Sequence, residues 1–299
     1  MSAAASRRLQ GVDAPPRIDA RAFHAALGRA AIVSLYDELA LAPKPGLVSF
    51  ADAGSHDDMD AATFLRSLFA LRHFFPRVAA QGARSTAFAP LETLGIAAES
   101  RMLQATGGVN THRGAIFTLG LLCAAAGAAH GAGLACSAAT LRATLRARWG
   151  DALASRARRA SGSHGARAAR AHGLRSAAEE AAQGLPTLFE HVLPALRFAR
   201  RAGAGDRGAR LHALFTAMAE LADTNLVHRG GLQGLRDAQR LAREFLAAGG
   251  GLGADAPERA ARVHALFVRR RLSPGGAADL LAAACWLERV ERLPLTAPR

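Results

Sequence analysis

Apolar residues recur along most of the chain at intervals of three and four positions, and alternation of apolar with polar residues is almost absent. The first spacing is typical of amphipathic α-helices, whereas the second would indicate β-strands. We therefore predict an all-α fold, a single compact multi-helix domain of about twelve helices over residues 19–293. Breaks at Gly and Pro place these helices at about 20–41, 60–80, 91–105, 112–130, 138–148, 151–160, 165–182, 186–201, 209–222, 231–248, 256–270 and 277–290.

Composition agrees with this pattern. The 299 residues are 50% hydrophobic but only 5% aromatic, and the helix formers Ala and Leu dominate. Residues 1–18 lack the apolar core of a signal peptide, so we expect a disordered lead-in there. The longest apolar run, residues 114–129, is short for a bilayer span, so it predicts a buried core helix rather than a membrane-spanning helix, and no membrane is expected as a partner.

The three cysteines, Cys123, Cys136 and Cys285, show no CxxC spacing and lie in apolar helical stretches. That pattern argues against a disulfide framework or a zinc site and favours a reducing, cytoplasmic location. The net charge is +14, which suits an acidic ligand or nucleic acid. Aromatic residues for base stacking are few, however, and no helix-turn-helix or zinc-finger pattern is present, so nucleic acid is not the expected partner.

Four polar, Gly-punctuated segments interrupt the Ala- and Leu-rich helices, each near an expected helix start. The first is PKPGLVS, residues 43–49, followed by GSHDDMD, residues 54–60. Two prolines stiffen the loop around Lys44, the only lysine of the chain, which with Gly46 and Ser49 is a candidate phosphate ligand. Asp57 and Asp58 are candidate Mg²⁺ ligands, His56 is a candidate catalytic group, and Asp60 is expected to cap the next helix.

The second segment is TGGVNTHRG, residues 106–114. Its glycines would let the backbone approach a ligand, and the following helix N-terminus offers free N–H groups and a positive dipole end, which suit phosphate. An ordinary capped turn is the alternative, with Asn110 or Thr111 as the cap. The candidate ligands are Gly107, Gly108, Asn110, Thr111, His112 and Arg113, and Glu99 on the preceding helix could reach the same site.

The third and fourth segments repeat this chemistry. DTNLVHRGG, residues 223–231, offers a carboxylate, an amide, an imidazole and a guanidinium before a Gly pair, and SPGGAAD, residues 273–279, is another Gly-rich helix entry. Helix–turn–helix corners are the alternative for both. The candidate phosphate or substrate ligands are Asn225, His228, Arg229, Gly230, Ser273, Gly275 and Gly276, while Asp223 and Asp279 are candidate metal ligands.

Several common signatures are absent. The chain contains no GxxxxGK[ST] phosphate loop, no GxSxG elbow, no HExxH, and no GxGxxG after a strand. A nucleotide site would therefore belong to a different, helical scheme.

The four segments resemble those of the triphosphoribosyl-dephospho-CoA synthases, which act in prosthetic-group synthesis for citrate lyase and malonate decarboxylase. The resemblance covers most of the chain in the family's order. It rests on PKPG at 43–46, GSHDDM at 54–59, Glu99, Met102, TGGVNTHRGAIF at 106–117, DTNLVHRGG at 223–231 and SPGGAADLLA at 273–282. Two positions depart from it: Arg113 replaces a lysine, and Ala178 stands where the GARxEA-like segment should have arginine, unless Arg175 substitutes.

The resemblance implies that the 5-triphosphoribosyl group of ATP moves to the 2′-hydroxyl of 3′-dephospho-CoA with release of adenine, with Mg²⁺ as cofactor. It further implies a downstream phosphoribosyl-dephospho-CoA transferase and an acyl carrier protein as partners, with the malonate decarboxylase branch favoured and a homodimer possible. A helical Mg²⁺-dependent hydrolase of the ADP-ribose type remains an alternative, as does a nucleic-acid-binding protein.

This chemistry needs cations for the triphosphate, a base for the acceptor hydroxyl and an acid for adenine. Asp223 or Glu99 are candidates for the base. His56, His112 or His228 are candidates for the acid, because histidine titrates near neutral pH. The sequence does not separate base from metal ligand.

Overall fold

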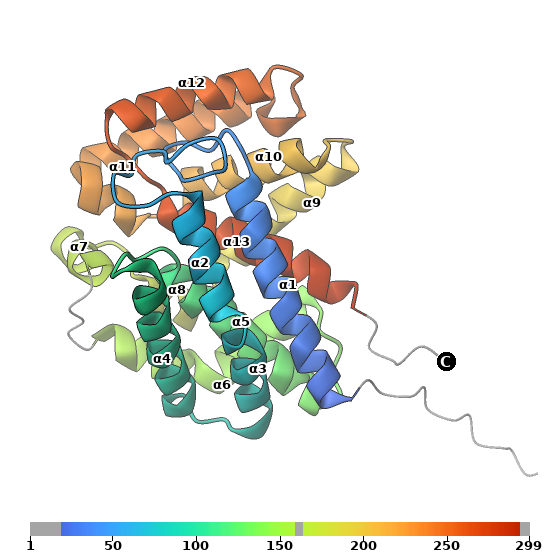
Figure 1. The fold of residues 1–299 in the computed structure, drawn as a ribbon. Coiled ribbons are helices and arrows are strands. Elements are labelled where there is room, and N and C mark those ends of the chain that lie inside the picture. The colour runs from blue at the N-terminus through green and yellow to red at the C-terminus, as the bar shows by residue number, and fades with distance from the viewer. Residues whose placement is uncertain (1–18, 159–163, 294–299) are drawn as a thin grey trace, which may run out of the picture.

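Two long apolar helices, α5 and α13, form the centre of the molecule, and the other helices pack around them (Figure 1). The structure is a computed structural model that describes residues 19–158 and 164–293. Every regular element in these ranges is helical, which confirms the predicted all-α class. The predicted lead-in, residues 1–18, lies outside the described residues.

The described ranges contain thirteen α-helices, close to the number expected, together with a π-helical turn, η1, and a 3₁₀ turn, η2. Their bounds are α1 Ala20–Ala40, α2 Ala61–Leu71, α3 Phe74–Arg84, α4 Ala89–Thr106, α5 Arg113–Gly131, α6 Ala138–Arg158, α7 His164–His172, α8 Ala177–Ala182, η1 Thr187–Val192, α9 Leu193–Arg201, α10 Asp206–Glu220, α11 Thr224–Ala247, η2 Gly250–Leu252, α12 Ala256–Arg269 and α13 Gly275–Glu291.

The apolar run at 114–129 forms the core of α5, whose side chains are buried against α1, α3, α4, α6 and α13. By length and composition α5 is the one helix among the described residues that could cross a membrane, yet 78% of its apolar window is buried inside the protein. Helix α13 is likewise buried along most of its length, against α1, α5 and α10. An apolar helix enclosed in this way is expected of a protein core.

Several predicted helix boundaries were wrong. The helix expected at 60–80 is divided into α2 and α3 by a turn at residues 72–73, and the one at 165–182 is divided by Gly173, whose φ is 62°. The helix expected at 186–201 begins as the π-helical turn η1. Conversely, residues 138–158 form one continuous helix through Gly150, because a helix tolerates an interior glycine; the end of the helix expected at 151–160 lies outside the described residues.

Helix α11, expected to begin at residue 231, consists of two helical parts that meet at Gly231, where φ is 64° and ψ is −170°. The second part begins where the prediction placed it, whereas the first part, from Thr224, was not predicted. The polar segment 223–231 is therefore mostly helix rather than loop. This places its first residues beside the start of α13.

Candidate active site

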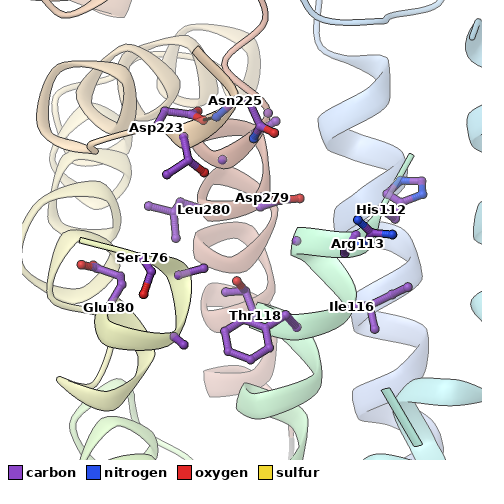
Figure 2. A pocket seen from close by; sticks show the side chains of 18 of the residues that line it. His112, Arg113, Ile116, Thr118, Ser176, Glu180, Asp223, Asn225, Asp279 and Leu280 are labelled. Atoms are coloured by element: carbon purple, nitrogen blue, oxygen red, sulfur yellow. Dashed lines mark hydrogen bonds between the residues drawn. The ribbon is translucent and has the colours of Figure 1, made fainter. Parts of the chain in front are cut away.

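A cavity of about 1390 Å³ opens where the first turns of α5, α11 and α13 come together. Its other walls come from α1, α4, the segment 56–59 and the segment 173–180. Segments two to four of the sequence therefore contribute to one site, as does part of the first. Figure 2 shows Asp279 projecting from α13 toward the first turn of α5, with Asp223 and Asn225 on the neighbouring side.

Most of the predicted site residues line this cavity: His56, Asp58, Glu99, Asn110, Thr111, His112, Arg113, Asp223, Asn225, His228, Arg229, Ser273, Gly275, Gly276 and Asp279. Others lie outside its lining: Lys44, Gly46, Ser49, Asp57, Gly107, Gly108 and Gly230. The glycines of the second segment have a local task instead. Gly107 and Gly108 take left-handed φ angles of 70° and 91°, and the Gly108 N–H bonds the Leu103 carbonyl at 2.7 Å, which ends α4.

Asp223 lies at the junction of two helix N-termini and is 1% exposed. Its Oδ1 accepts the Asn225 backbone N–H at 2.9 Å, and its Oδ2 accepts the Ala277 N–H at 3.1 Å. Burial raises the pKa of the Asp223 carboxyl, and these N–H donors act against that rise. The two carboxylate oxygens of Asp223 thus hold the starts of α11 and α13. These contacts favour a structural role for Asp223, which was a candidate for the base.

Asp279 makes an equivalent contact with α5. Its carboxylate accepts the backbone N–H of Ala115, and it lies so close to Gly114 that a Cβ there would be 1.9 Å from Oδ2. Burial, followed by the neighbouring carboxylates of Glu38 and Asp223, raises the pKa of the Asp279 carboxyl well above its usual range. The carboxylates of Asp279, Glu38 and Asp223 therefore lie close enough to influence one another, and all three residues line the cavity.

The helix N-termini after Gly108 and Gly276 were predicted to bind phosphate through free N–H groups. In the structure one N–H group of each first turn is bonded to a carboxylate, at Ala115 and at Ala277. A carboxylate is an anion that satisfies the helix dipole as a phosphate would, so these two donors are already occupied.

His56 is held between two polar partners. Its Nδ1 lies 2.9 Å from Arg229 Nη2 and its Nε2 lies 2.9 Å from Ser273 Oγ. Because a guanidinium only donates, Nδ1 must accept, and the ring proton is on Nε2. Burial and then the charge of Arg229 lower the pKa of His56. The ring is therefore neutral near pH 7 and joins segment 56–59 to α11 and to the start of α13.

His112 begins α5 and is 3% exposed. Its Nδ1 lies 2.7 Å from Ser67 Oγ on α2, and its ring edge packs on Phe64. Burial, then Lys44, lowers the pKa of His112 to about 3. The predicted role as an acid charged at neutral pH does not fit this environment.

Three polar atoms at the start of α5 lack a hydrogen-bond partner among the described residues: Thr111 Oγ1, His112 Nε2 and Arg113 Nε. Each is shielded from solvent, and buried polar groups without a partner are uncommon in proteins. The expected caps have different outcomes. Asp60 forms a reciprocal capping box with Thr63 on α2, which confirms the cap expected there. Asn110 Oδ1 accepts the Arg113 N–H at 3.2 Å, but the N-cap residue of α5 is His112.

Lys44 is almost fully buried, and its ammonium bonds Glu38 twice: the carboxylate at 2.5 Å and the backbone carbonyl at 2.7 Å. Burial lowers the pKa of Lys44, and Glu38 opposes that shift. The predicted phosphate ligand is thus occupied by a carboxylate. Glu38 itself lines the cavity beside Asp279. It escaped the sequence analysis because a single glutamate on an apolar helix gives no motif.

Two arginines that line the cavity form ion pairs with glutamates. Arg113 pairs with Glu99, and Arg175 Nη1 pairs with Glu180 Oε2 at 2.9 Å. The second pair matters because Arg175 was the expected substitute for the arginine missing at Ala178. Arg175, Ala178 and Glu180 all line the cavity. The sequence analysis missed Arg156 and Arg170 on the same wall, because arginine is too common in this chain to stand out.

The four expected metal ligands do not converge. Asp57 is exposed beside Arg271, and Asp58 lies 3.6 Å from His56, away from the pair Asp223 and Asp279. Among the described residues, no group of three or more His, Cys, Asp or Glu side chains has the arrangement of a metal site. A cation held entirely by the protein is therefore not expected in this cavity.

Residues 24–296 match the model of a family described as CitG, ATP:dephospho-CoA triphosphoribosyl transferase. The chain belongs to this family. The match begins in α1 and extends beyond the end of α13, so it includes every element around the cavity.

Relatives of the triphosphoribosyl transferase family are similar over nearly their whole length. A probable 2-(5″-triphosphoribosyl)-3′-dephosphocoenzyme-A synthase of Acinetobacter calcoaceticus is 39% identical over 259 residues, 86% of this chain and 88% of that protein. The 2-(5″-triphosphoribosyl)-3′-dephosphocoenzyme-A synthase of Klebsiella pneumoniae is 42% identical over 268 residues, 88% and 94% of the two chains. No solved structure matches the chain. The family resemblance is thereby confirmed.

Proposed function

We propose that this protein transfers the 5-triphosphoribosyl group of ATP to the 2′-hydroxyl of 3′-dephospho-CoA. In this reaction the bond between C1′ of ATP and adenine N9 breaks, and the 2′-oxygen of the acceptor bonds to C1′. The hydroxyl proton is lost to a base, and adenine leaves after gaining a proton. Family membership supports both substrates.

The observation that carries the proposal is one cavity that combines carboxylates with arginines. The carboxylates are those of Glu38, Asp223 and Asp279, and the arginines are Arg113 and Arg175. Breaking a glycosidic bond builds positive charge at C1′, which carboxylates stabilise, while arginines bind phosphates. The volume of about 1390 Å³ is large enough for two nucleotide-sized ligands by the usual size of such sites.

We assign Asp279 as the base that removes the proton of the acceptor hydroxyl. Asp223 already accepts backbone N–H groups on both oxygens, whereas Asp279 is only half-buried, lines the cavity and has one backbone donor. A base must lie within hydrogen-bond reach of the proton that it removes. Asp279 meets that condition for a ligand in the cavity centre, and Asp223 is too enclosed to do so without releasing a helix end.

Mg²⁺ is proposed to enter with the triphosphate. This ion usually binds one or two carboxylates together with substrate phosphates, and the negative charge gathered at Asp279, Asp223 and Glu38 suits such a cation. Asp58, an exposed carboxylate that lines the cavity, would supply one ligand and the phosphates the others, and the ion would neutralise phosphate charge. Binding of ATP measured with and without Mg²⁺ tests this, independently of turnover.

The later steps are proposals of the same kind. The product would be a precursor that a phosphoribosyl-dephospho-CoA transferase attaches to an acyl carrier protein, with the malonate decarboxylase branch favoured over citrate lyase. We also propose a cytoplasmic location, supported by three buried free cysteines, and a homodimer as the form to test first.

Adenine release measured with and without 3′-dephospho-CoA tests the main proposal. We expect adenine, and a product with the mass of triphosphoribosyl-dephospho-CoA, only when the acceptor is present. Equal adenine release without acceptor would identify a hydrolase instead. No release under either condition would contradict both reactions.

A further inference from the structure

Helix α4 presents two glutamates to the cavity, Glu92 and Glu99. Seven residues separate them, which is close to two helical turns, so both lie on one face about 10 Å apart. Gly95 and Ile96, between them, line the same cavity. One face of α4 therefore forms a wall that carries negative charge at two separated points.

Each of these glutamates holds an arginine from a different helix. Glu92 pairs with Arg156 near the end of α6, and Glu99 pairs with Arg113 at the start of α5. The side chains of the first pair are 24% and 39% exposed, and those of the second are 30% and 40% exposed. Because all four side chains also line the cavity, a ligand can reach both pairs.

Partly exposed ion pairs of this kind contribute little to stability, because water screens both charges. A phosphate offers an arginine a stronger partner, since two N–H groups of the guanidinium can bind two oxygens in parallel. A triphosphate carries several negative charges along a chain and can meet two arginines at once. It would therefore compete well with the glutamates for Arg113 and Arg156.

We propose that Glu92 and Glu99 hold Arg156 and Arg113 in place in the empty cavity, and that the triphosphate of ATP replaces these carboxylates when it binds. Arg156, outside every motif, thereby becomes a phosphate ligand, and the two glutamates become residues that set the affinity for ATP. This inference rests on the proposed function, because it uses ATP as the ligand. Arg170 of α7 lines the same wall.

A purely structural task for the two pairs predicts a different result. If Glu92 and Arg156 only tied α4 to α6, loss of either partner would loosen the wall, and both losses would weaken ligand binding. If the glutamate competes with phosphate, its loss strengthens binding while loss of the arginine weakens it. Opposite signs for the two partners of one ion pair therefore separate the two interpretations.

The experiment measures the affinity for ATP and for inorganic tripolyphosphate by calorimetry. For Glu92→Gln and Glu99→Gln we expect about two- to fivefold tighter binding of both ligands, as removal of a weak competing pair predicts. For Arg156→Gln we expect binding about tenfold weaker or more, the usual effect of losing a hydrogen bond to a charged group. Glu244→Gln removes the same charge from the exposed pair with Arg240 on α11, away from the cavity, and should leave both affinities unchanged.

Weaker binding in Glu92→Gln would overturn the proposal, as would unchanged affinity in both Glu92→Gln and Arg156→Gln. Loss of folding cannot imitate the expected result, because an unfolded protein does not bind more tightly. Tripolyphosphate keeps this test separate from the proposed reaction. If it binds with the expected pattern but no adenine is released with 3′-dephospho-CoA, the phosphate site stands and the transfer reaction fails.

Discussion

Asp223 accepts a hydrogen bond from the backbone N–H of Ala277 at 3.1 Å, although 54 positions separate the two residues. The same carboxylate caps α11 through the Asn225 N–H at 2.9 Å. One side chain thus fixes the first turns of two helices whose ends form the cavity. Its burial means that neither bond is readily replaced by water.

Asp223→Asn should therefore reduce the stability of the fold. The amide keeps one acceptor oxygen but directs an NH₂ group at a backbone N–H, so one helix end loses its acceptor. Loss of a buried acceptor or a cap costs about 1–2 kcal/mol. Urea unfolding measures this, with Asp60→Asn, which affects the partly exposed cap of α2, as a milder comparison. An unchanged unfolding midpoint would show that Asp223 is not the structural link described above.

Gly114→Ala should move Asp279. The new Cβ would lie 1.9 Å from Asp279 Oδ2, which no pair of atoms tolerates, so the carboxylate must leave its place. We expect kcat/KM for adenine release to fall by about tenfold or more, in line with misplacement of a reacting group. Gly131→Ala on the same helix meets nothing closer than 3.7 Å and should keep its activity. Equal activity of the two variants would exclude a reacting role for Asp279.

Asp279→Asn should raise stability and reduce turnover. Its pKa is raised in the folded protein by burial and by Glu38 and Asp223, so the ionised carboxylate opposes folding above the raised value, and protonation removes that cost as the pH falls. The amide keeps an acceptor for the Ala115 N–H but carries no charge. We expect a higher thermal midpoint than wild type at pH 8, a difference that shrinks toward pH 5, and adenine release lowered by about 10²–10⁴-fold. A variant less stable than wild type at pH 8 would contradict this account.

Sequence periodicity was sufficient for the fold class because the apolar residues that form the core recur at helical spacing along the chain. The apolar helices α5 and α13 were placed within a few residues. Gly150 and Gly173 show the limit of this approach: Gly150 lies inside a continuous helix, whereas Gly173 follows the end of α7 with a left-handed φ of 62°, and the residue type is the same in both places.

The site was predicted in part for a similar reason. Residues that carry polar atoms next to a helix start, such as Asn225 and His112, are visible in sequence, and both line the cavity. Contacts between distant segments are not visible. Sequence alone could not indicate that Glu38 would bind Lys44, or that Asp279 would fill the first turn of α5, because neither pairing follows a helical or turn spacing.

The buried ring of His112 should make the fold less stable in acid. Burial, then Lys44, lowers the pKa of its ring from 6.5 to about 3 in the folded protein, whereas the unfolded chain regains the ordinary value. The unfolded state therefore binds more protons between these values, and the stability contributed by the neutral ring is present above pH 6.5 and lost as the pH falls toward 3. His112→Gln removes this titration, so its free energy of unfolding should fall less than that of wild type between pH 7.5 and pH 4. Urea unfolding at several pH values measures the difference, with His172→Gln on α7 as an exposed control. Parallel pH profiles for wild type and His112→Gln would show that His112 is not held neutral by its surroundings.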